Sequence, residues 1–492
     1  MWLSNFKEKH HNWYILVVAF LFAFFTLLSC SVITSFIYPQ ISTIAYYNDG
    51  AMFHILGASM AKGYTPYIEV FDHKGLYLFY YTAIGAGLGK YGIFIIQLIL
   101  MTTAYFFIYK AIELHSKKSS ILLIAFFLFT IFYAFSGQTP NDSDLELPFN
   151  AIMIYFYLKG MKNDDDRSFL YGNIAAGVSA GIAVNLRMSD ALLPFAFTLY
   201  FFVRSIMRKE TKTLFINAGI VVGTMIVMSI PPFIHAAAGG FLSDMVDAVY
   251  LNNFKYITTT GQRDDGLPII AYIAVPLIFV IYFLLLFFKR NIWKKDYIIF
   301  NAVTCGVVGV IELVIAFYPH YFIVLYPYLA VTLTILLTPY LEHEETETKL
   351  ARPISLACLV VTLASLAFNP VLYGINRSID MANINFINNI VSDEAKNGHT
   401  LIFGSPAYYL TNNIKIGYGD FSCQDNHILF SERYSEANLA KYLASDDSMY
   451  LITNAGHVKQ AEDLFAKYGL VTSYEKLYSP VGVTITIYEH KI

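Results

Sequence analysis

The chain has 492 residues, of which 56% are hydrophobic and only 14% are charged, whereas soluble globular proteins carry about 25% charged residues. Together with a mean hydropathy of +0.51, this composition excludes a water-facing globular fold and indicates a chain that needs lipid as its solvent. The net charge of -3 provides no general basic field, so we expect no nucleic-acid partner.

About eleven apolar stretches are predicted to span a membrane, which takes about 20 residues of helix; several are shorter and would need flanking residues or a different tilt. The first stretch is too long for the core of a signal peptide, so we expect it to be retained. Two neighbouring stretches, 170–186 and 190–207, fit either two separate spans or one broken helix plus a hairpin. The predicted spans are 13–38, 92–112, 121–136, 147–159, 170–186, 190–207, 214–235, 268–288, 297–317, 321–339 and 353–370.

Lysine and arginine are concentrated in alternate loops between these spans, among them Lys117, Lys118, Lys294 and Lys295. Because such residues are retained on the cytoplasmic side of a membrane, the N-terminus is predicted to be cytoplasmic and everything after the last span extracytoplasmic. No organelle-targeting signal and no disulfide pattern is apparent, which favours a bacterial plasma membrane as the location.

The first predicted outer loop, 39–91, holds charged residues beside apolar stretches near the membrane, where such residues are costly and usually functional. The stretch 51–61 is predicted to form a helix along the interface, with Asp49 near its N-terminus. The stretch 76–88 is apolar and aromatic but too short to span, so we expect it to lie along the outer boundary. Between them come the segments Gly63-Tyr64-Thr65-Pro66-Tyr67 and Asp72-His73-Lys74-Gly75.

The second outer loop carries an acidic cluster, in which Glu146 directly precedes a predicted span and Asp144 lies two residues earlier. Two acids that face one cavity would also suit a divalent cation, and the sequence leaves metal use open. Arg187 separates two apolar segments. It is interpreted either as an arginine that reaches the interface, paired with Asp190, or as a contact to a phosphate, which the guanidinium fork suits.

The tail, 371–492, changes character and is predicted to form a small α/β domain on the outer surface. Its apolar or alternating segments 400–403, 449–453 and 482–488 are expected to be strands. The segments 436–444 and 457–468 have apolar residues at helical spacing and are expected to be helices.

These features resemble a known family. An acidic residue after the first span, a G-x-x-P-Y turn at Gly63–Tyr67 and a D-H-K-G element at Asp72–Gly75 are similar to the polyprenyl-phosphate-sugar-dependent glycosyltransferases of the GT-C superfold. That group includes protein O-mannosyltransferases and lipid A aminoarabinose transferases. The segment His320-Tyr321-Phe322-Ile323-Val324-Leu325-Tyr326-Pro327 resembles a late-helix motif of the same group.

The resemblance implies an all-α polytopic membrane fold of about eleven spans over 1–370, with the small extracytoplasmic α/β domain at 371–492. It also implies a chemistry, in which an acceptor hydroxyl attacks the anomeric carbon of a polyprenyl-phosphate-linked sugar and inverts it. The acceptor would be a cell-wall polymer, a lipid-linked glycan or a protein. No cofactor is firmly implied, and a divalent cation remains an option.

By the same resemblance, Asp49 would accept or position the acceptor's proton, and Glu146 would be the second catalytic acid. Lys74 would neutralise the leaving phosphate. Further substrate contacts are expected from Asp72, His73, Arg187, Arg263, His320 and Tyr321. Plainer interpretations stay open: Asp49 would cap a helix, and Asp72, His73 and Lys74 would form a surface turn with a local ion pair.

Two other functions compete with glycosyl transfer. A flippase or transporter of lipid-linked glycans would favour inverted repeats and polar sites at the membrane midplane, and the sequence shows no repeat. A polymerase or ligase that uses lipid-diphosphate donors would favour a large, arginine-rich late outer loop, whereas here the longest outer loop before the tail is the first and is acidic.

Overall fold

The computed structural model describes residues 11–30, 49–89, 91–136, 142–253, 282, 284, 294–314, 319–341, 353, 356, 360, 381–403, 408–409, 412–417, 421–422 and 435–491. Long helices form most of this part of the chain: α2 (His11–Cys30), α5 (Gly92–Glu113), α6 (Ser119–Ser136), α7 (Leu147–Asn163), α8 (Asp166–Val184), α9 (Leu192–Met207), α10 (Thr211–Ala238), α14 (Lys295–Val314) and α15 (Tyr326–Leu341). Of these helical stretches, five are long and apolar enough to cross a membrane.

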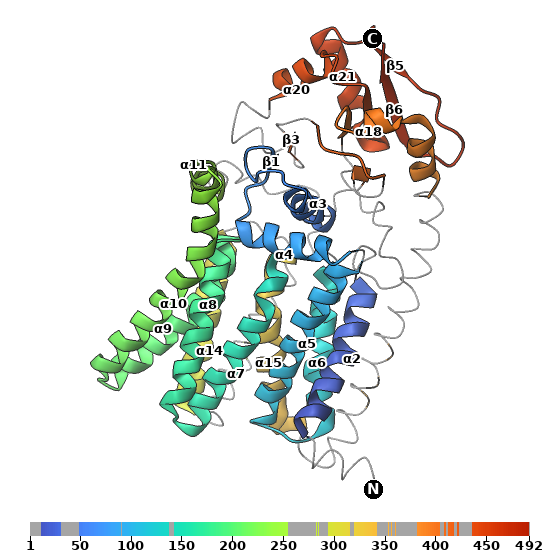
Figure 1. Cartoon of the computed structure of the whole chain (residues 1–492). Coiled ribbons are helices and arrows are strands. Elements are labelled where there is room, and N and C mark those ends of the chain that lie inside the picture. Colours follow the sequence, from blue (N-terminus) through green and yellow to red (C-terminus); the bar gives the residue numbers. More distant parts are fainter. Residues whose placement is uncertain are drawn as a thin grey trace.

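The long helices agree with nine of the predicted spans, and α8 and α9 are two separate helices rather than one broken helix. The other two predictions, 268–288 and 353–370, fall almost entirely outside the described residues. Helices α2, α5, α6, α7, α8, α14 and α15 stand side by side as a bundle and α9 packs on α14, whereas α10 leans outward (Figure 1). The predicted polytopic membrane architecture is therefore confirmed.

Aromatic side chains fill the centre of the bundle. Phe197 meets Phe300 edge to face with ring centroids 4.7 Å apart, and Tyr105 meets Phe126 in the same way at 4.9 Å. The Tyr105 hydroxyl also hydrogen-bonds to the buried Thr130 hydroxyl at 2.6 Å. Since lipid gives no hydrophobic force between helices, such packing and internal hydrogen bonds are what hold membrane helices together.

The two ends of the bundle differ. At one end, Arg204 and Arg208 bind Asp164 at 2.9 and 2.7 Å, and Arg208 also binds Asp296 at 2.8 Å. These contacts tie together the turns between α7 and α8 and between α9 and α10, and the start of α14. All of them belong to loops that the charge pattern assigns to the inside, and they lie at the end of the bundle opposite to the C-terminal domain (Figure 1).

At the other end, α4 (Leu76–Gly87) runs across the tops of the helices and α3 (Asp49–Ala61) packs on it (Figure 1). The pair approach so closely that a Cβ at Gly57 would lie 2.1 Å from the Thr82 hydroxyl oxygen. Both segments are helical where the sequence predicts helices in the first outer loop. They form a lid of two short helices between the bundle and the C-terminal domain.

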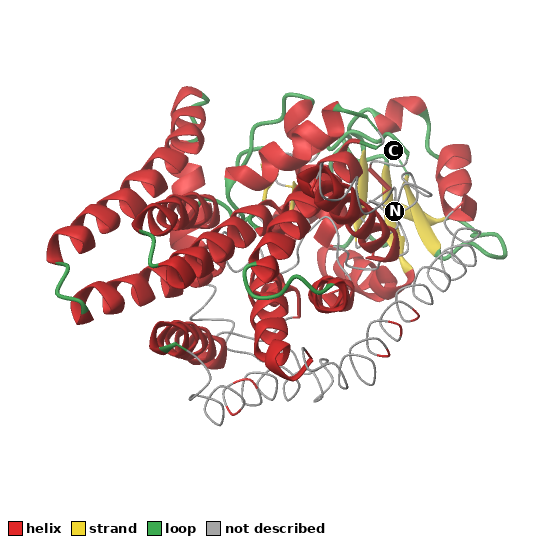
Figure 2. Ribbon diagram, turned by 90° about the horizontal axis from the view of Figure 1, so that it is seen from below, coloured by secondary structure: helices red, strands yellow, loops and turns green. Residues whose placement is uncertain are grey.

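The C-terminal domain contains a four-stranded sheet in the order β2 (Thr400–Phe403), β4 (Tyr450–Asn454), β6 (Ile485–His490), β5 (Tyr474–Lys476), in which only β2 and β4 are parallel. Helices α18 (Asp393–Lys396), α20 (Glu436–Leu443) and α21 (Val458–Tyr468) accompany it. Seen from below, the strands lie together behind one side of the bundle (Figure 2). The predicted α/β domain is confirmed, whereas β5 and the helix at 381–390 were not predicted.

The first outer loop and the tail are joined. Strand β1 (Val70–Phe71) pairs in parallel with β3 (Phe421–Ser422), and the Tyr64 hydroxyl donates to the Ile416 carbonyl at 3.0 Å. One continuous buried cluster includes Leu56 of α3 and Ile452 of β4. The outer loop is thus held from both sides, by the bundle and by the tail. The predicted division at 370 and 371 stays a prediction, because residues 361–380 lie outside the described part.

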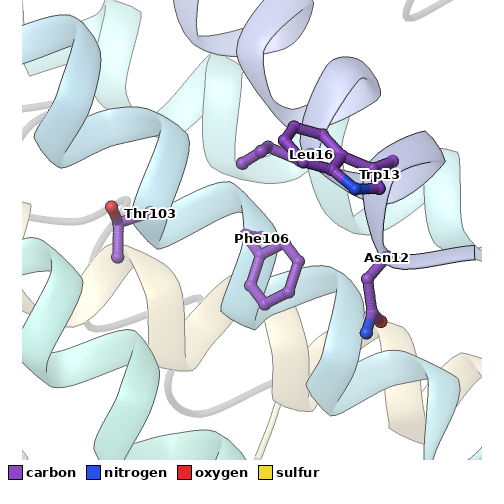
Figure 3. Close-up of a pocket in the computed structure, with 5 residues that line it drawn as sticks. All are labelled: Asn12, Trp13, Leu16, Thr103 and Phe106. Atoms are coloured by element: carbon purple, nitrogen blue, oxygen red, sulfur yellow. The ribbon is translucent and has the colours of Figure 1, made fainter.

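An open groove of about 310 Å³ lies between α2 and α5, lined by Asn12, Trp13, Leu16, Thr103 and Phe106 (Figure 3). Its lining is mostly apolar, and Trp13 is 64% exposed. Exposed apolar side chains are expected where a helix faces lipid, so we interpret this groove as a lipid-facing surface and not as a catalytic site.

Candidate functional site

The Asp72–Gly75 element lies between β1 and α4 and turns inward. The Asp72 carboxylate accepts the backbone N–H of Lys74 at 2.8 Å, and the Tyr67 hydroxyl donates to the Lys74 carbonyl at 2.9 Å. Asp72 is fully buried and Lys74 is only 8% exposed, which argues against a simple surface turn. The backbone is therefore fixed on two sides, and the Lys74 ammonium group is directed into the protein.

Gly75 sets how closely this turn approaches the bundle. Its N–H donates to the Leu186 carbonyl at 2.9 Å. A Cβ at this position would lie 1.7 Å from the Asn185 carbonyl oxygen, so only glycine fits. The contact places the turn against the C-terminal end of α8, directly before Arg187.

Arg187 is buried and held by two side chains. Its Nε donates to Asp190 Oδ1 at 2.8 Å, and its Nη2 donates to the Ser143 hydroxyl at 2.6 Å. The Ser143 hydroxyl in turn donates to Asp190 Oδ2 at 2.7 Å. The pairing with Asp190 suggested by the sequence is present. Since these are charge-assisted hydrogen bonds of full strength, the guanidinium plane is fixed in orientation.

Asp142 joins the two cations. One carboxylate oxygen lies 3.3 Å from Arg187 Nη1 and the other lies 3.7 Å from Lys74 Nζ. Asp142 is the first residue of the short 3-10 helix η1 (Asp142–Leu145) and is 1% exposed. Two buried positive charges from distant parts of the sequence thus share a single carboxylate.

The two acids that the sequence singles out in this loop have different surroundings. Asp144 accepts from Gln97 Nε2 at 2.6 Å and from the Tyr133 hydroxyl at 2.7 Å, which indicates a structural role in joining α5, α6 and η1. Glu146 is fully buried, and within the described part of the chain neither of its carboxylate oxygens has a hydrogen-bond partner.

Burial raises the pKa of Glu146 well above its ordinary value, and the nearby carboxylate of Asp190 raises this pKa further, against the opposing charge of Arg187. Such surroundings favour the neutral, protonated form of a carboxyl group. A protonated carboxyl is a hydrogen-bond donor as well as an acceptor, and Glu146 is near enough to Arg187 for the charge of Arg187 to act on it.

The remaining predicted residues are placed only in part. Asp49 is the first residue of α3, and His320 and Tyr321 lie on the 3-10 helix η4 (Pro319–Leu325), but the side chains of all three lie outside the described part, as does Arg263 altogether. The predicted proximity of Asp49 to Lys74 therefore stays a prediction. The His73 imidazole Nε2 lies 3.2 Å from Lys74 Nζ.

Sequence reasoning missed the roles of Asp142 and Ser143. Both belong to the acidic loop segment, but nothing in its spacing shows which side chains turn toward Arg187. Divalent-cation use remains open: within the described residues, no group of three or more His, Cys, Asp or Glu side chains is arranged to hold a metal ion.

Comparisons with known proteins agree with this fold. The family model described as "Dolichyl-phosphate-mannose-protein mannosyltransferase" matches residues 74–234, a stretch that begins at Lys74 and includes Asp142, Glu146 and Arg187. The architecture is the GT-C polytopic membrane fold, as the sequence resemblance implies.

A particular structure with this fold is the "Crystal Structure of ArnT from Cupriavidus metallidurans bound to Undecaprenyl phosphate". It superposes with a TM-score of 0.57 at 11% sequence identity, and the alignment covers 96% of this chain and 97% of that chain. A search of curated protein sequences gives no match. At this sequence identity the likeness shows the fold alone.

Proposed function

We propose that the protein is a membrane glycosyltransferase that transfers a sugar from a polyprenyl-phosphate donor to an acceptor outside the cytoplasm. The observation that carries this proposal is the pair of buried cations, Lys74 and Arg187, that meet at Asp142. When the sugar leaves its carrier, negative charge develops on the carrier phosphate. Fixed positive charges that face this phosphate in a water-poor site stabilise the transition state strongly.

The two cations suit different parts of this task. Asp190 and Ser143 hold Arg187 through its Nε and Nη2 atoms, so its Nη1 donor stays directed toward the site, whereas Lys74 provides a compact point charge. Two features support such a binding role: the family model that matches this stretch describes a dolichyl-phosphate-mannose-dependent enzyme, and the similar ArnT structure is bound to undecaprenyl phosphate.

The acids complete the proposed mechanism. Asp49, at the start of α3, accepts the proton of the attacking acceptor hydroxyl, and direct displacement by that hydroxyl inverts the anomeric centre. Glu146, whose burial favours the protonated form, donates a hydrogen bond toward the leaving phosphate. Asp72 and His73 hold and screen Lys74, and Arg263, His320 and Tyr321 remain proposed donor contacts.

The lid and the tail define where the acceptor approaches. The lid of α3 and α4 lies between the bundle and the C-terminal domain (Figure 1). An acceptor that approaches from the aqueous side meets the C-terminal domain first, while a lipid donor arrives from the bilayer. A cell-wall polymer, a lipid-linked glycan and a protein remain the proposed acceptor classes, and the plasma membrane remains the proposed location.

A flippase is favoured less by the described residues. Transporters place their charged or ion-binding groups near the membrane midplane, whereas the buried amides deeper in this bundle, Asn150, Asn173 and Asn301, are neutral and hydrogen-bonded to neighbouring side chains. The described charged groups collect instead at the two ends of the helices, as a surface-facing transferase requires.

The proposal is tested with purified protein and a panel of polyprenyl-phosphate sugars and acceptors. Wild type is expected to transfer sugar, and Asp49→Asn and Lys74→Gln are expected to lose transfer while they still insert in the membrane. Lys62 is an exposed lysine of the same outer loop. The variant Lys62→Gln serves as the matched control and should retain activity. Lipid translocation in liposomes without any sugar transfer would replace the proposal with the flippase alternative.

A further inference from the structure

The Asp142 carboxylate lies between the two cations to which the proposed function assigns the carrier phosphate. Each of its oxygens faces a different cation, Arg187 Nη1 at 3.3 Å and Lys74 Nζ at 3.7 Å. A phosphate also presents two or more anionic oxygens on one central atom, and arginine and lysine recognise it by the same charge-assisted contacts. Phosphate and Asp142 therefore compete for the same two positive charges.

The contacts of Asp142 with the two cations are longer than those that Asp190 and Ser143 make with Arg187. Arg187 lies 2.7–2.8 Å from Asp190 and 2.6 Å from Ser143, so it keeps firm partners if Asp142 withdraws. At 3.3 and 3.7 Å, the bridge to Asp142 exceeds the length of strong charge-assisted hydrogen bonds, about 2.7–2.9 Å. Exchange of Asp142 for a phosphate therefore leaves the rest of the cluster intact.

The chemistry of transfer makes such a competitor useful. The donor is a phosphodiester with one negative charge, whereas the spent carrier is a phosphomonoester with about 1.5 to 2 negative charges at neutral pH. Two fixed cations bind the more highly charged product more strongly than the donor. Without an opposing group, the site would hold its own product.

We propose that Asp142 is a built-in competitor for the carrier phosphate. It neutralises Lys74 and Arg187 in the empty site, withdraws when the donor phosphate docks, and returns to expel the spent lipid phosphate after transfer. This inference rests on the proposed function for its place in turnover, but the competition itself concerns phosphate binding alone.

Binding of undecaprenyl phosphate to the purified full-length protein tests the competition. Asp142→Asn, which keeps the size of the side chain and removes its charge, is expected to bind this lipid about tenfold more tightly. Asp144→Asn is the matched control, because Asp144 contacts Gln97 and Tyr133 rather than either cation, and its phosphate affinity should equal that of wild type. Equal or weaker binding by Asp142→Asn would overturn the proposal.

Two further variants secure the result. The Asp142 carboxylate accepts the backbone N–H of Ser143 at 3.0 Å, and Asp142→Ser keeps an oxygen that can accept this bond. This variant gives the same test if Asp142→Asn does not fold. Addition of Lys74→Gln to Asp142→Asn should abolish the gain in affinity, because one of the two cations is then absent. Retention of the gain would show that Asp142 acts through something other than this pair.

Turnover distinguishes this inference from the proposed function. If sugar is transferred, Asp142→Asn should slow multiple turnover about tenfold more than it slows single-turnover transfer, with stronger inhibition by undecaprenyl phosphate. If no donor is processed by wild type, the transferase proposal fails, yet tighter lipid-phosphate binding by Asp142→Asn would still support the competition.

Discussion

Replacement of Gly75 by alanine tests whether the contact between the outer loop and α8 sets the geometry of the cation pair. The new Cβ would lie 1.7 Å from the Asn185 carbonyl oxygen, and Cβ contacts below 3.0 Å essentially do not occur, so the turn has to retreat by about 1.3 Å. That shift breaks the buried hydrogen bond between the Gly75 N–H and the Leu186 carbonyl, which is now 2.9 Å long.

Overpacking costs about 1–3 kcal/mol and the lost buried hydrogen bond about 1–3 kcal/mol more, so Gly75→Ala should lower stability by roughly 2–6 kcal/mol. Lys74 moves with the turn, and a displacement of about 1 Å reduces catalysis by roughly a hundredfold. The assay measures the thermal unfolding midpoint in detergent and sugar transfer. Gly87→Ala is the control, because no atom lies within 4 Å of its added Cβ. Wild-type behaviour of Gly75→Ala would refute the close-approach argument.

Three other predictions follow from the site and its support. The pKa of Glu146 in the folded protein is raised above 4.5. Between 4.5 and that raised pKa, the folded protein keeps the Glu146 proton whereas the unfolded chain releases it. Stability should therefore fall as pH rises from about 4.5 through the raised pKa, and Glu146→Gln should flatten this dependence in thermal unfolding scans. Arg187→Lys should weaken undecaprenyl phosphate binding about tenfold, because a single ammonium group that contacts Asp190 cannot also take the place of the Nη1 donor; unchanged binding would exclude a phosphate role. Tyr64→Phe, which removes the bond to Ile416, should cost about 1 kcal/mol, and an unaltered unfolding midpoint would show that this link adds nothing.

The bundle and the sheet of the tail could be predicted from the sequence because their signals are local. Long, predominantly apolar runs define α5 and α10 to within a few residues, and runs of that length have few other structural solutions. Strands β2, β4 and β6 follow from short apolar or alternating segments. The two-residue strands β1 and β3 have no comparable signal, since each exists only because the other is present.

The site was predictable in composition but not in its pairings. Lys74 and Arg187 stand out because charged residues beside apolar segments need a reason. Their meeting at Asp142 depends on how α4, α8 and η1 pack, which no local pattern encodes. The acids differ for the same reason: Asp144 finds Gln97 and Tyr133 from other helices, whereas Glu146, two residues later, finds no such partner within the described residues.

The link between the outer loop and the tail has a consequence for biosynthesis. Tyr64 and its partner Ile416 are 352 residues apart in the chain, and a stretch of similar length separates β1 from β3. At about 5–20 residues per second, ribosomes need roughly 20–70 s to cover that interval. The nascent loop must therefore remain without its final cover until the last quarter of the polypeptide emerges, so its exposed apolar side chains need protection from aggregation for that time.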